Sequence, residues 1–345
     1  MELNRIILKF IDAEDCMVSP ISNGLINTTY LVENNQTQEK YILQKINTEV
    51  FKDPERIINN HLKINKILQE NDYQLYIAEP VSSSSKEFLI TDENGHQWRM
   101  TGFIDNSITF LTVPSAETAF KAAQAVGYFL SMINNTTTLP VIEDPLPDFL
   151  NFEKRILDYK ISLEDGTSAL KESAKTEIAL MNQLLELPHQ WIQMQNNGQL
   201  PKRIIHADAK ISNILFDQNH DPMAVIDLDT IMISTILYDF GTMIQSYTNT
   251  TNEDDGTAKD NFNPNIFKSV KEGFLFHLKD QLTYEEFENL DYAAQVAIYI
   301  QGLRFLTDYL NGSTYYSIKY PEHNLDRTKN QLELLKGLRT YLKCD

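Results

Sequence analysis

Four polar residues stand at fixed spacing among short apolar runs between positions 204 and 228 of the 345-residue chain. His206 precedes Asp208 by two positions, and Asn213 follows Asp208 by five. Asp227 lies fourteen positions beyond Asn213. A single Asp in a turn is more often a cap or a solvated loop residue. Four such residues at this spacing, each beside strand-like apolar sequence, favour a functional site.

The segment that begins at Asn213 has the pattern of a β-hairpin. Two short apolar runs, 213–216 and 223–228, are separated by the turn-rich segment 217–222. This pattern predicts two antiparallel strands joined by a turn. The hairpin would carry Asn213 and Asp227 to the same end of the ribbon, where two ligands of a metal ion must meet.

The residue types suit phosphoryl transfer from a nucleotide. Asp208 can orient and deprotonate an acceptor hydroxyl, while the Asn213 amide oxygen and the Asp227 carboxylate can hold Mg²⁺. The spacing His-x-Asp-x-x-x-x-Asn is that of a kinase catalytic loop. The sequence therefore predicts ATP-dependent transfer of a phosphoryl group, with Asp208 as the catalytic base.

Three further polar residues are predicted to support this site. Lys210 is a candidate to steady the transferred phosphoryl group, although an exposed loop lysine is the alternative. Asp229 is expected to support the metal ligands from the next outward position. Asp239 begins a predicted helix and can brace the catalytic loop by accepting its backbone N–H groups.

A polar loop near the N-terminus is the candidate site for the nucleotide phosphates. Small or amide-bearing residues let backbone N–H groups approach a phosphate. Asn23, Gly24, Asn27 and Thr28 have these properties and precede a predicted pair of strands, so we assign them to nucleotide binding. One glycine is a weak signal, and a plain hairpin turn is the alternative.

The return strand of that pair, 40–46, is expected to present a cation to the phosphates, as the third strand of kinases does. Because strand side chains alternate, only one of Gln44 and Lys45 can face the nucleotide. Both remain candidates, with a solvated strand lysine as the alternative for Lys45. The helix that follows shows no glutamate to pair with the cation. His61 is the one possible partner there, and a half-buried helix histidine is the alternative.

Composition limits the partners of the chain. The formal net charge of −18 argues against a nucleic-acid-binding surface, because neutralising phosphates takes an excess of Lys and Arg. The two cysteines, Cys16 and Cys344, do not indicate a disulfide framework and fit a reduced cytoplasm. No signal peptide and no long uncharged apolar run is evident, so we expect no membrane span. Nothing in the sequence suggests an obligate protein partner.

The pattern of predicted elements changes after the first third of the chain. Strand pairs dominate up to a predicted hairpin with an Asn-Gly turn at 94–95, whereas helical spacing of apolar residues begins after Pro114. We expect an α+β, two-lobed, protein-kinase-like fold. Residues 1–105 would form a nucleotide-binding lobe with an antiparallel sheet, and 106–345 a mainly helical catalytic and substrate-binding lobe. The polar segment 249–265 is predicted to be a mobile surface loop.

The catalytic stretch resembles the aminoglycoside phosphotransferase and choline kinase superfamily, whose loop has the same spacing and whose metal-binding Asp follows on a hydrophobic strand. Within the superfamily, the chain is most similar to the N-acetylhexosamine 1-kinases. The similarity lies in Asn23–Tyr30, Leu43–Phe51, Asp227–Thr230, Tyr238–Gly241, Gly302–Leu310 and Tyr320–Leu325.

The resemblance implies that the chain phosphorylates the anomeric hydroxyl of an amino sugar, N-acetylglucosamine or N-acetylgalactosamine, to give the sugar 1-phosphate. Asp208 would then contact the acceptor, and Arg304 and Tyr316 are candidate substrate contacts. A structural ion pair for Arg304 and a loop anchor for Tyr316 are the alternatives. Kinases of choline, ethanolamine or aminoglycosides, and a catalytically silent nucleotide-binding regulator, are the alternative functions.

Overall fold

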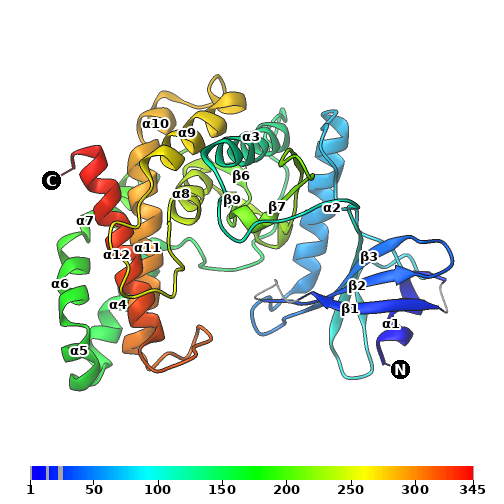
Figure 1. Cartoon of the computed structure of the whole chain (residues 1–345), viewed down its shortest axis with the longest axis horizontal. Helices are drawn as coiled ribbons and strands as arrows, with labels where there is room; N and C mark the ends of the chain where they lie inside the picture. Colours follow the sequence, from blue (N-terminus) through cyan, green and yellow to red (C-terminus); the bar gives the residue numbers. More distant parts are fainter. Residues whose placement is uncertain (1, 13–14, 22–25, 345) are drawn as a thin grey trace. The chain divides into compact units, whose positions relative to one another are not determined.

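The structure of the protein is a computed structural model that describes residues 2–12, 15–21 and 26–344 (Figure 1). The chain forms two compact units, each assembled from separate segments of the sequence. Unit 1 consists of Met1–Thr109, Met132–Pro147 and Asn213–Ile233, and unit 2 of Phe110–Ser131, Asp148–Ser212 and Ser234–Asp345. Asp208 therefore belongs to unit 2, whereas Asn213 and Asp227 belong to unit 1.

The described part of unit 1 contains a five-stranded antiparallel sheet with the strand order β1-β2-β3-β5-β4. The strands are β1 (Cys16–Ile21), β2 (Thr28–Asn34), β3 (Lys40–Ile46), β4 (Ile90–Thr91) and β5 (Gln97–Gly102). In the β3–β5 pair, Gln44 lies opposite Arg99 and Lys45 lies opposite Trp98. Cross-strand partners project from the same face of a sheet, and successive residues project from opposite faces.

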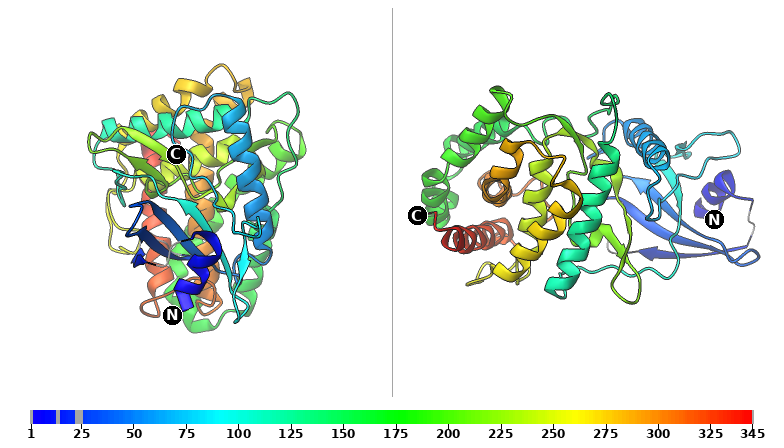
Figure 2. Two further views of the ribbon diagram at one scale, coloured as in Figure 1. Left: turned by 90° about the vertical axis from the view of Figure 1, so that its right-hand side faces the viewer. Right: turned by 90° about the horizontal axis from the view of Figure 1, so that it is seen from above.

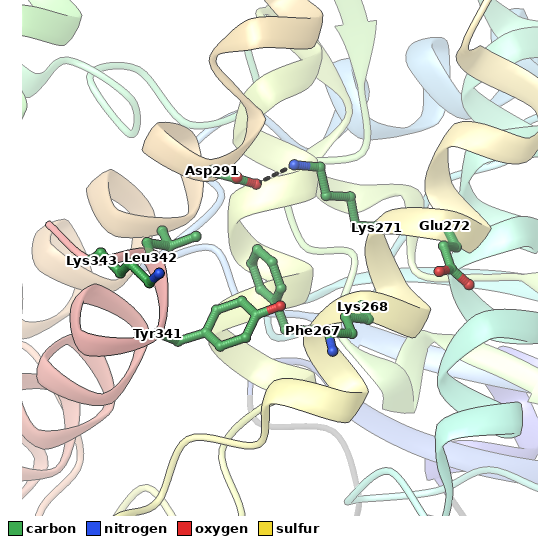
Figure 3. A pocket seen from close by; sticks show the side chains of 8 residues that line it. All are labelled: Phe267, Lys268, Lys271, Glu272, Asp291, Tyr341, Leu342 and Lys343. Atoms are coloured by element: carbon green, nitrogen blue, oxygen red, sulfur yellow. Dashed lines mark hydrogen bonds and ion pairs between the residues drawn. The ribbon is translucent and has the colours of Figure 1, made fainter.

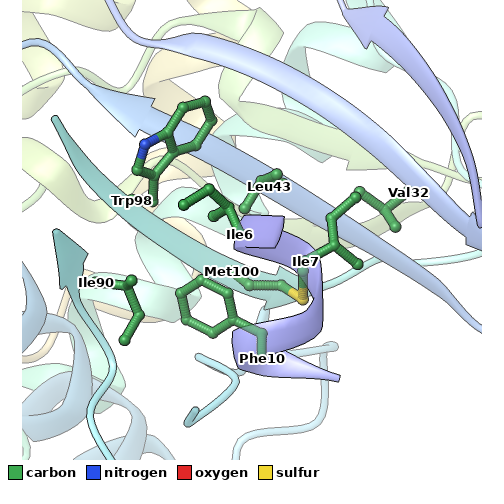
Figure 4. Packing of buried hydrophobic residues seen from close by; sticks show 8 residues of the cluster. All are labelled: Ile6, Ile7, Phe10, Val32, Leu43, Ile90, Trp98 and Met100. Atoms are coloured by element: carbon green, nitrogen blue, oxygen red, sulfur yellow. The ribbon is translucent and has the colours of Figure 1, made fainter. Parts of the chain in front are cut away.

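One face of the sheet packs against α1 (Glu2–Phe10), as Figure 4 shows. Ile6, Ile7 and Phe10 lie on one side of the helix because their spacing matches its period. They form a buried apolar cluster with residues from four strands, Val32, Leu43, Ile90, Trp98 and Met100. Since Leu43 and Trp98 face α1, Lys45 projects toward the same side of the sheet.

The other face of the sheet lies toward α2 (Pro54–Glu70). Ile46, at the end of β3, packs in a buried cluster with Ile57 of α2. Gln44 shares the face of Ile46, because residues two apart on a strand point the same way. Gln44 and its cross-strand partner Arg99 therefore project toward the α2 side.

The predicted hairpin after Asn213 is present, but its second strand is shorter than expected. The elements of this segment are η1 (Ile211–Asn213), β7 (Ile214–Phe216), β8 (Pro222–Val225), η2 (Leu228–Thr230) and β9 (Met232–Ser234). The strand ends because Asp227 has left-handed backbone angles, φ 63° and ψ 60°, from which the 3₁₀ turn η2 starts. A non-glycine residue in this region of φ/ψ space is uncommon and marks a constrained position.

Unit 2 is mainly helical, and its long helix α11 packs against α4, α8 and α12. Figures 1 and 2 show α12, in red, beside α11, in orange. The elements are α3 (Ala116–Ile133), which ends in unit 1, and α4 (Phe152–Asp165), α5 (Ser168–Ser173), α6 (Lys175–Gln183), α7 (Glu186–Asn196), β6 (Arg203–Ile205), α8 (Ile236–Tyr247), α9 (Pro264–Leu278), α10 (Tyr284–Glu288), α11 (Leu290–Leu310) and α12 (His323–Leu342). Gly241 allows α8 to approach α11 closely, because a Cβ there would lie 2.7 Å from the Ala293 carbonyl oxygen.

These features confirm the predicted α+β class, with an antiparallel sheet in one unit and a larger helical unit. The segment 249–263 forms no helix or strand, as expected of a loop, and α12 contacts it. The side-chain amide of Asn330 donates to Thr251 Oγ1 and to the carbonyl oxygens of Asn252 and Asp255, each at 3.0 Å. None of the described helices is long and apolar enough to cross a membrane.

Candidate active site

A buried carboxylate holds the catalytic loop in unit 2. Asp239 on α8 accepts the backbone N–H of His206 on Oδ2 and that of Ala207 on Oδ1, both at 2.7 Å. Burial raises the pKa of Asp239 to about 6, although His206 and the two N–H donors lower it. The predicted bracing of the loop by Asp239 is therefore confirmed.

The conformation of the loop is imposed by its surroundings. Ala207 has a φ of 64°, which costs a residue with a side chain on the order of 1–3 kcal/mol. His206 is fully buried beside the ring of Phe129, and its Nδ1 lies 3.3 Å from the backbone nitrogen of Asp208, which donates to it. Together these contacts set the direction in which the Asp208 side chain leaves the backbone.

The Asp208 carboxylate is partly exposed and forms an ion pair within its own loop. Its Oδ2 lies 2.6 Å from Nζ of Lys210, and each side chain is about one third exposed, at 33% and 36%. A partly exposed carboxylate on a braced loop can receive a proton from a bound hydroxyl. Lys210, the second predicted catalytic residue, lies beside it in the same unit.

The hairpin brings the two predicted metal ligands to the same end of β7 and β8 in unit 1. The Ile226 N–H donates to the Asn213 carbonyl oxygen at 2.9 Å, directly before Asp227. Asn213 is buried, whereas Asp227 is exposed beyond the end of β8. The shorter second strand does not change this arrangement, because the pairing between Ile214 and Val225 sets it.

The chemistry of this donor pair fits Mg²⁺. An amide oxygen and a carboxylate are hard oxygen ligands, and Mg²⁺ is commonly held by one or two protein ligands together with substrate phosphates and water. In the described parts of the chain, no group of three or more His, Cys, Asp or Glu residues has the geometry of a metal cage. Asn213 and Asp227 are thus suited to a metal ion that is shared with a nucleotide.

A buried polar network lies on the α2-facing side of the unit 1 sheet. Arg99 Nε donates to Gln44 Oε1 at 2.9 Å, and Arg99 Nη1 lies 2.6 Å from Asp229 Oδ1. The amide of Gln44 also donates to Thr29 Oγ1 at 3.2 Å. The exposed fractions of the Arg99 and Asp229 side chains are 6% and 4%. Asp229, expected to support the metal ligands, therefore pairs with Arg99, which lies outside the predicted site residues.

The predicted nucleotide-binding residues are divided between the two faces of the sheet. Asn27 joins the network, because its Nδ2 donates to Asp229 Oδ2 at 2.8 Å and its Oδ1 accepts the Asn47 N–H at 3.0 Å. Thr28 begins β2 and is exposed, opposite Lys45. Lys45 projects toward α1, away from Gln44. Asn23 and Gly24 lie outside the described residues.

His61 on α2 is a neutral neighbour of this network. It is buried, and its Nε2 lies 2.8 Å from the Ala78 carbonyl oxygen. Burial, followed by the positive charge of Arg99, lowers the pKa of His61 to about 4, although Asp229 and the hydrogen bond to Ala78 oppose this shift. His61 is therefore uncharged at neutral pH. The residue that pairs with the buried guanidinium of Arg99 is Asp229.

The two predicted substrate contacts lie together in unit 2. Arg304 on α11 is held between aromatic rings, with its guanidinium carbon 5.1 Å from the Phe149 ring centroid and 5.6 Å from that of Tyr316. A cavity of about 230 Å³ opens beside them, between α4, α11 and the residues after α11. The hydroxyl of Tyr316 is buried and has no hydrogen-bond partner in the described part of the chain.

Two arginines, Arg155 and Arg304, and two aspartates, Asp158 and Asp308, line this cavity. Arg155 on α4 lines it together with Arg304, and burial, followed by the charge of Arg304, lowers the pKa of Arg155. The carboxylate of Asp308 accepts the backbone N–H groups of Thr314, Tyr315 and Tyr316 at 2.8 to 3.0 Å. Its negative charge is thus used to fix the segment that carries Tyr316.

Tyr238 connects this cavity with the catalytic loop within unit 2. Its ring packs against Phe149 with centroids 6.4 Å apart. Burial raises the pKa of Tyr238 to about 12, Arg304 acts against this shift, and the charge of Asp208 adds to it. The buried tyrosine is therefore close enough to both Arg304 and Asp208 to sense their charges.

A second cavity in unit 2, of about 480 Å³, contains none of the predicted site residues (Figure 3). Lys271 forms an ion pair with Asp291 at 2.5 Å, and the ammonium of Lys268 lies 5.9 Å from the ring centroid of Tyr341. Lys271 and Lys268 thus contact side chains of α11 and α12, and the described residues around the cavity do not include a second catalytic arrangement.

Comparisons with known proteins bear on the family and the fold of the chain. A sequence profile described as the phosphotransferase enzyme family matches residues 18–265, more than half of the chain. The match includes the catalytic loop, the hairpin and the sheet, and it ends before α11 and α12.

Several experimental structures share the fold at low sequence identity. A microcompartment-associated aminopropanol kinase is 15% identical, with a TM-score of 0.69 over 99% of this chain and 97% of that chain. An aminoglycoside phosphotransferase from Alicyclobacillus acidocaldarius is 12% identical, with a TM-score of 0.65 over 98% and 95%. A choline kinase from Streptococcus pneumoniae is 16% identical, with a TM-score of 0.58 over 99% and 100%. These similarities confirm the expected kinase-like fold.

Proposed function

The chain belongs to the phosphotransferase enzyme family, and we propose that it is an ATP-dependent kinase of N-acetylhexosamines that forms the sugar 1-phosphate. The observation that carries the kinase proposal is the braced Asp208 on a loop of kinase spacing, followed by a hairpin that returns Asn213 and Asp227 to one end. ADP was bound in two similar structures, a spectinomycin phosphotransferase and a second aminoglycoside phosphotransferase, which supports ATP as the donor.

In the proposed reaction, the Asp208 carboxylate takes the proton of the acceptor hydroxyl while the hydroxyl oxygen attacks the γ-phosphorus of ATP. The bond from that phosphorus to the bridging oxygen breaks, and ADP leaves with the bonding electrons. Asp239 and His206 keep Asp208 in position, and Lys210 offers a positive charge beside it. Asn213 and Asp227 would hold Mg²⁺, which would neutralise charge on the phosphates.

The acceptor proposal rests on the cavity beside Arg304. A cationic acceptor such as choline or an aminoglycoside favours carboxylates and exposed aromatic faces. Two carboxylates, Asp158 and Asp308, line the cavity, and Asp308 already accepts three backbone N–H groups. The donors beside them are the guanidiniums of Arg155 and Arg304 and the buried Tyr316 hydroxyl. Such donors suit the amide carbonyl and hydroxyl oxygens of an uncharged amino sugar. An anomeric hydroxyl is also more acidic than an ordinary alcohol, so a carboxylate is an adequate base.

The test is ADP release with ATP and Mg²⁺ across N-acetylglucosamine, N-acetylgalactosamine, glucose, galactose, choline and kanamycin. We expect turnover only with the N-acetyl sugars, together with loss of the reducing end, because a 1-phosphate blocks the anomeric carbon. Turnover with a product that remains reducing would contradict anomeric transfer. Turnover with choline or kanamycin alone would overturn the sugar proposal and retain the kinase, whereas nucleotide binding with no acceptor turned over would favour a silent regulator.

A further inference from the structure

The strand position that should carry the phosphate-binding cation holds an uncharged residue. In kinases this cation is a lysine on the third strand. On β3, the residue that faces the α2 side is Gln44, and Lys45 projects to the α1 side. Arg99 on β5 lies directly opposite Gln44 and projects from the same face. We propose that Arg99 is the residue that binds the nucleotide phosphates, an inference that rests on the proposed kinase function.

The guanidinium of Arg99 is already oriented for such a role. Its Nε donates to Gln44 Oε1 at 2.9 Å, and the Gln44 amide is itself fixed by its hydrogen bond to Thr29 Oγ1. In the described residues its contacts are made by Nε and Nη1. A guanidinium carries five N–H donors in a planar fork, so donors remain for the oxygens of a phosphate.

The ion pair between Arg99 and Asp229 does not satisfy all the buried polar atoms of the two side chains. Although Arg99 Nη1 lies 2.6 Å from Asp229 Oδ1, the two atoms are not aligned as a hydrogen bond. Both are buried and have no hydrogen-bond partner in the part of the chain that the structure describes. A buried ion pair contributes little net stability unless its remaining groups are satisfied. A bound phosphate would accept hydrogen bonds from the Arg99 donors that the contact with Asp229 leaves unused.

The location of the pair also points to the nucleotide. Asp229 lies two residues beyond Asp227, a predicted metal ligand, and its Oδ2 is held by Asn27, a predicted nucleotide contact. His61, the residue of α2 next to the pair, is neutral, so Asp229 is the counter-ion. The proposed phosphate site therefore lies within unit 1. Its cation is Arg99 on β5, and Asp229 keeps that guanidinium charged and in place. Gln44 and Asn27 complete the site.

The experiment measures dissociation constants for adenosine, AMP, ADP and ATP with Mg²⁺ in the full chain and in Arg99→Gln. We expect the variant to bind ADP and ATP about 10- to 100-fold more weakly, the effect of losing a charge-assisted hydrogen bond, while its affinity for adenosine is unchanged. Arg5→Gln is the matched control, because Arg5 forms an exposed ion pair with Glu93 in the same unit. It should bind all four ligands as the unsubstituted protein does.

Two further variants keep the test decisive if Arg99→Gln folds poorly. Arg99→Lys retains the charge and loses the fork, so ADP binding should weaken less and adenosine binding should stay unchanged. Gln44→Lys combined with Arg99→Gln returns the cation to β3 and should recover ADP affinity. If Arg99→Gln weakens adenosine and ADP binding equally, or leaves ADP binding unchanged, the proposed role of Arg99 is wrong. Turnover of an acceptor by the unsubstituted protein would still support the kinase proposal in that case. Absence of any nucleotide binding by that protein would overturn both.

Discussion

Asp239 on α8 accepts the backbone N–H of Ala207 at 2.7 Å, one residue before the proposed catalytic base. Ala207 has left-handed backbone angles, and its neighbour His206 donates to the other oxygen of the same carboxylate. The position of Asp208 is therefore set by a helix that begins 28 residues later in the sequence. This bracing fixes the backbone that carries the base, and the ion pair with Lys210 is the contact of the Asp208 side chain itself.

Replacing Asp239 by Asn should lower both stability and turnover. An amide has only one acceptor oxygen, so one of the two backbone N–H groups would face the NH₂ group and lose its buried hydrogen bond. We expect a loss of about 1–3 kcal/mol in the free energy of unfolding, measured by urea denaturation. The exposed Asp280→Asn is the control and should change neither quantity. Unchanged stability and turnover in Asp239→Asn would contradict the bracing role.

The raised pKa of Asp239 predicts a pH dependence of stability. Because the folded-state pKa of about 6 exceeds the ordinary value of 3.8, the folded protein binds more protons than the unfolded chain between these values. The contribution of this group is full below about pH 4 and is lost as the pH rises through about 6. The difference in unfolding free energy between the unsubstituted protein and Asp239→Asn should therefore shrink from pH 4 to pH 7. A difference that grows over this range would show that the carboxylate is stabilised in its charged form.

The neutral state of His61 can be measured directly by NMR titration of its ring protons. We expect a midpoint near pH 4, because burial and then the charge of Arg99 lower its pKa. In Arg99→Gln the midpoint should move upward, since the second of these causes is removed. A midpoint at 6 or above in the unsubstituted protein would mean that His61 is exposed or pairs as a cation with Asp229.

Removing the Tyr316 hydroxyl tests whether Tyr316 contacts the substrate or only anchors its loop. The substitution Tyr316→Phe deletes a buried group that has no partner among the described residues, so stability should stay unchanged or rise slightly. If the hydroxyl binds the acceptor, KM for the sugar should rise about 5- to 10-fold, the value of one hydrogen bond, with KM for ATP unaffected. An unchanged KM for the sugar would leave Tyr316 as an anchor that packs on Arg304.

The parts of the site that depend on local sequence could be predicted. The loop spacing and the hairpin after Asn213 follow from short-range patterns, because turn residues and strand alternation act over a few positions. The early end of the second strand could not be predicted, because nothing in the residue type of Asp227 requires left-handed backbone angles. Its conformation comes from the surrounding structure.

The contacts that join distant segments could not be predicted in the same way. The Arg99–Asp229 pair depends on the register between β3 and β5 and on the turn after β8, which no local pattern defines. The sequence feature that could have indicated this pair is Arg99 itself, an arginine next to Trp98 in a short strand. The polar residues of 249–265 predict a loop, but not that Asn330 of α12 donates to three of its oxygen atoms.

The most direct test of the central claim is turnover by Asp208→Asn, with ADP affinity and the urea midpoint measured on the same preparation. The substitution keeps the shape of the side chain and removes the base, so turnover should fall by about 10²–10⁴. Nucleotide binding and stability should stay near those of the unsubstituted protein, because Asp239 holds the loop through backbone N–H groups and the Asn amide oxygen can still accept from Lys210. Turnover close to that of the unsubstituted protein would contradict the assignment of Asp208 as the base.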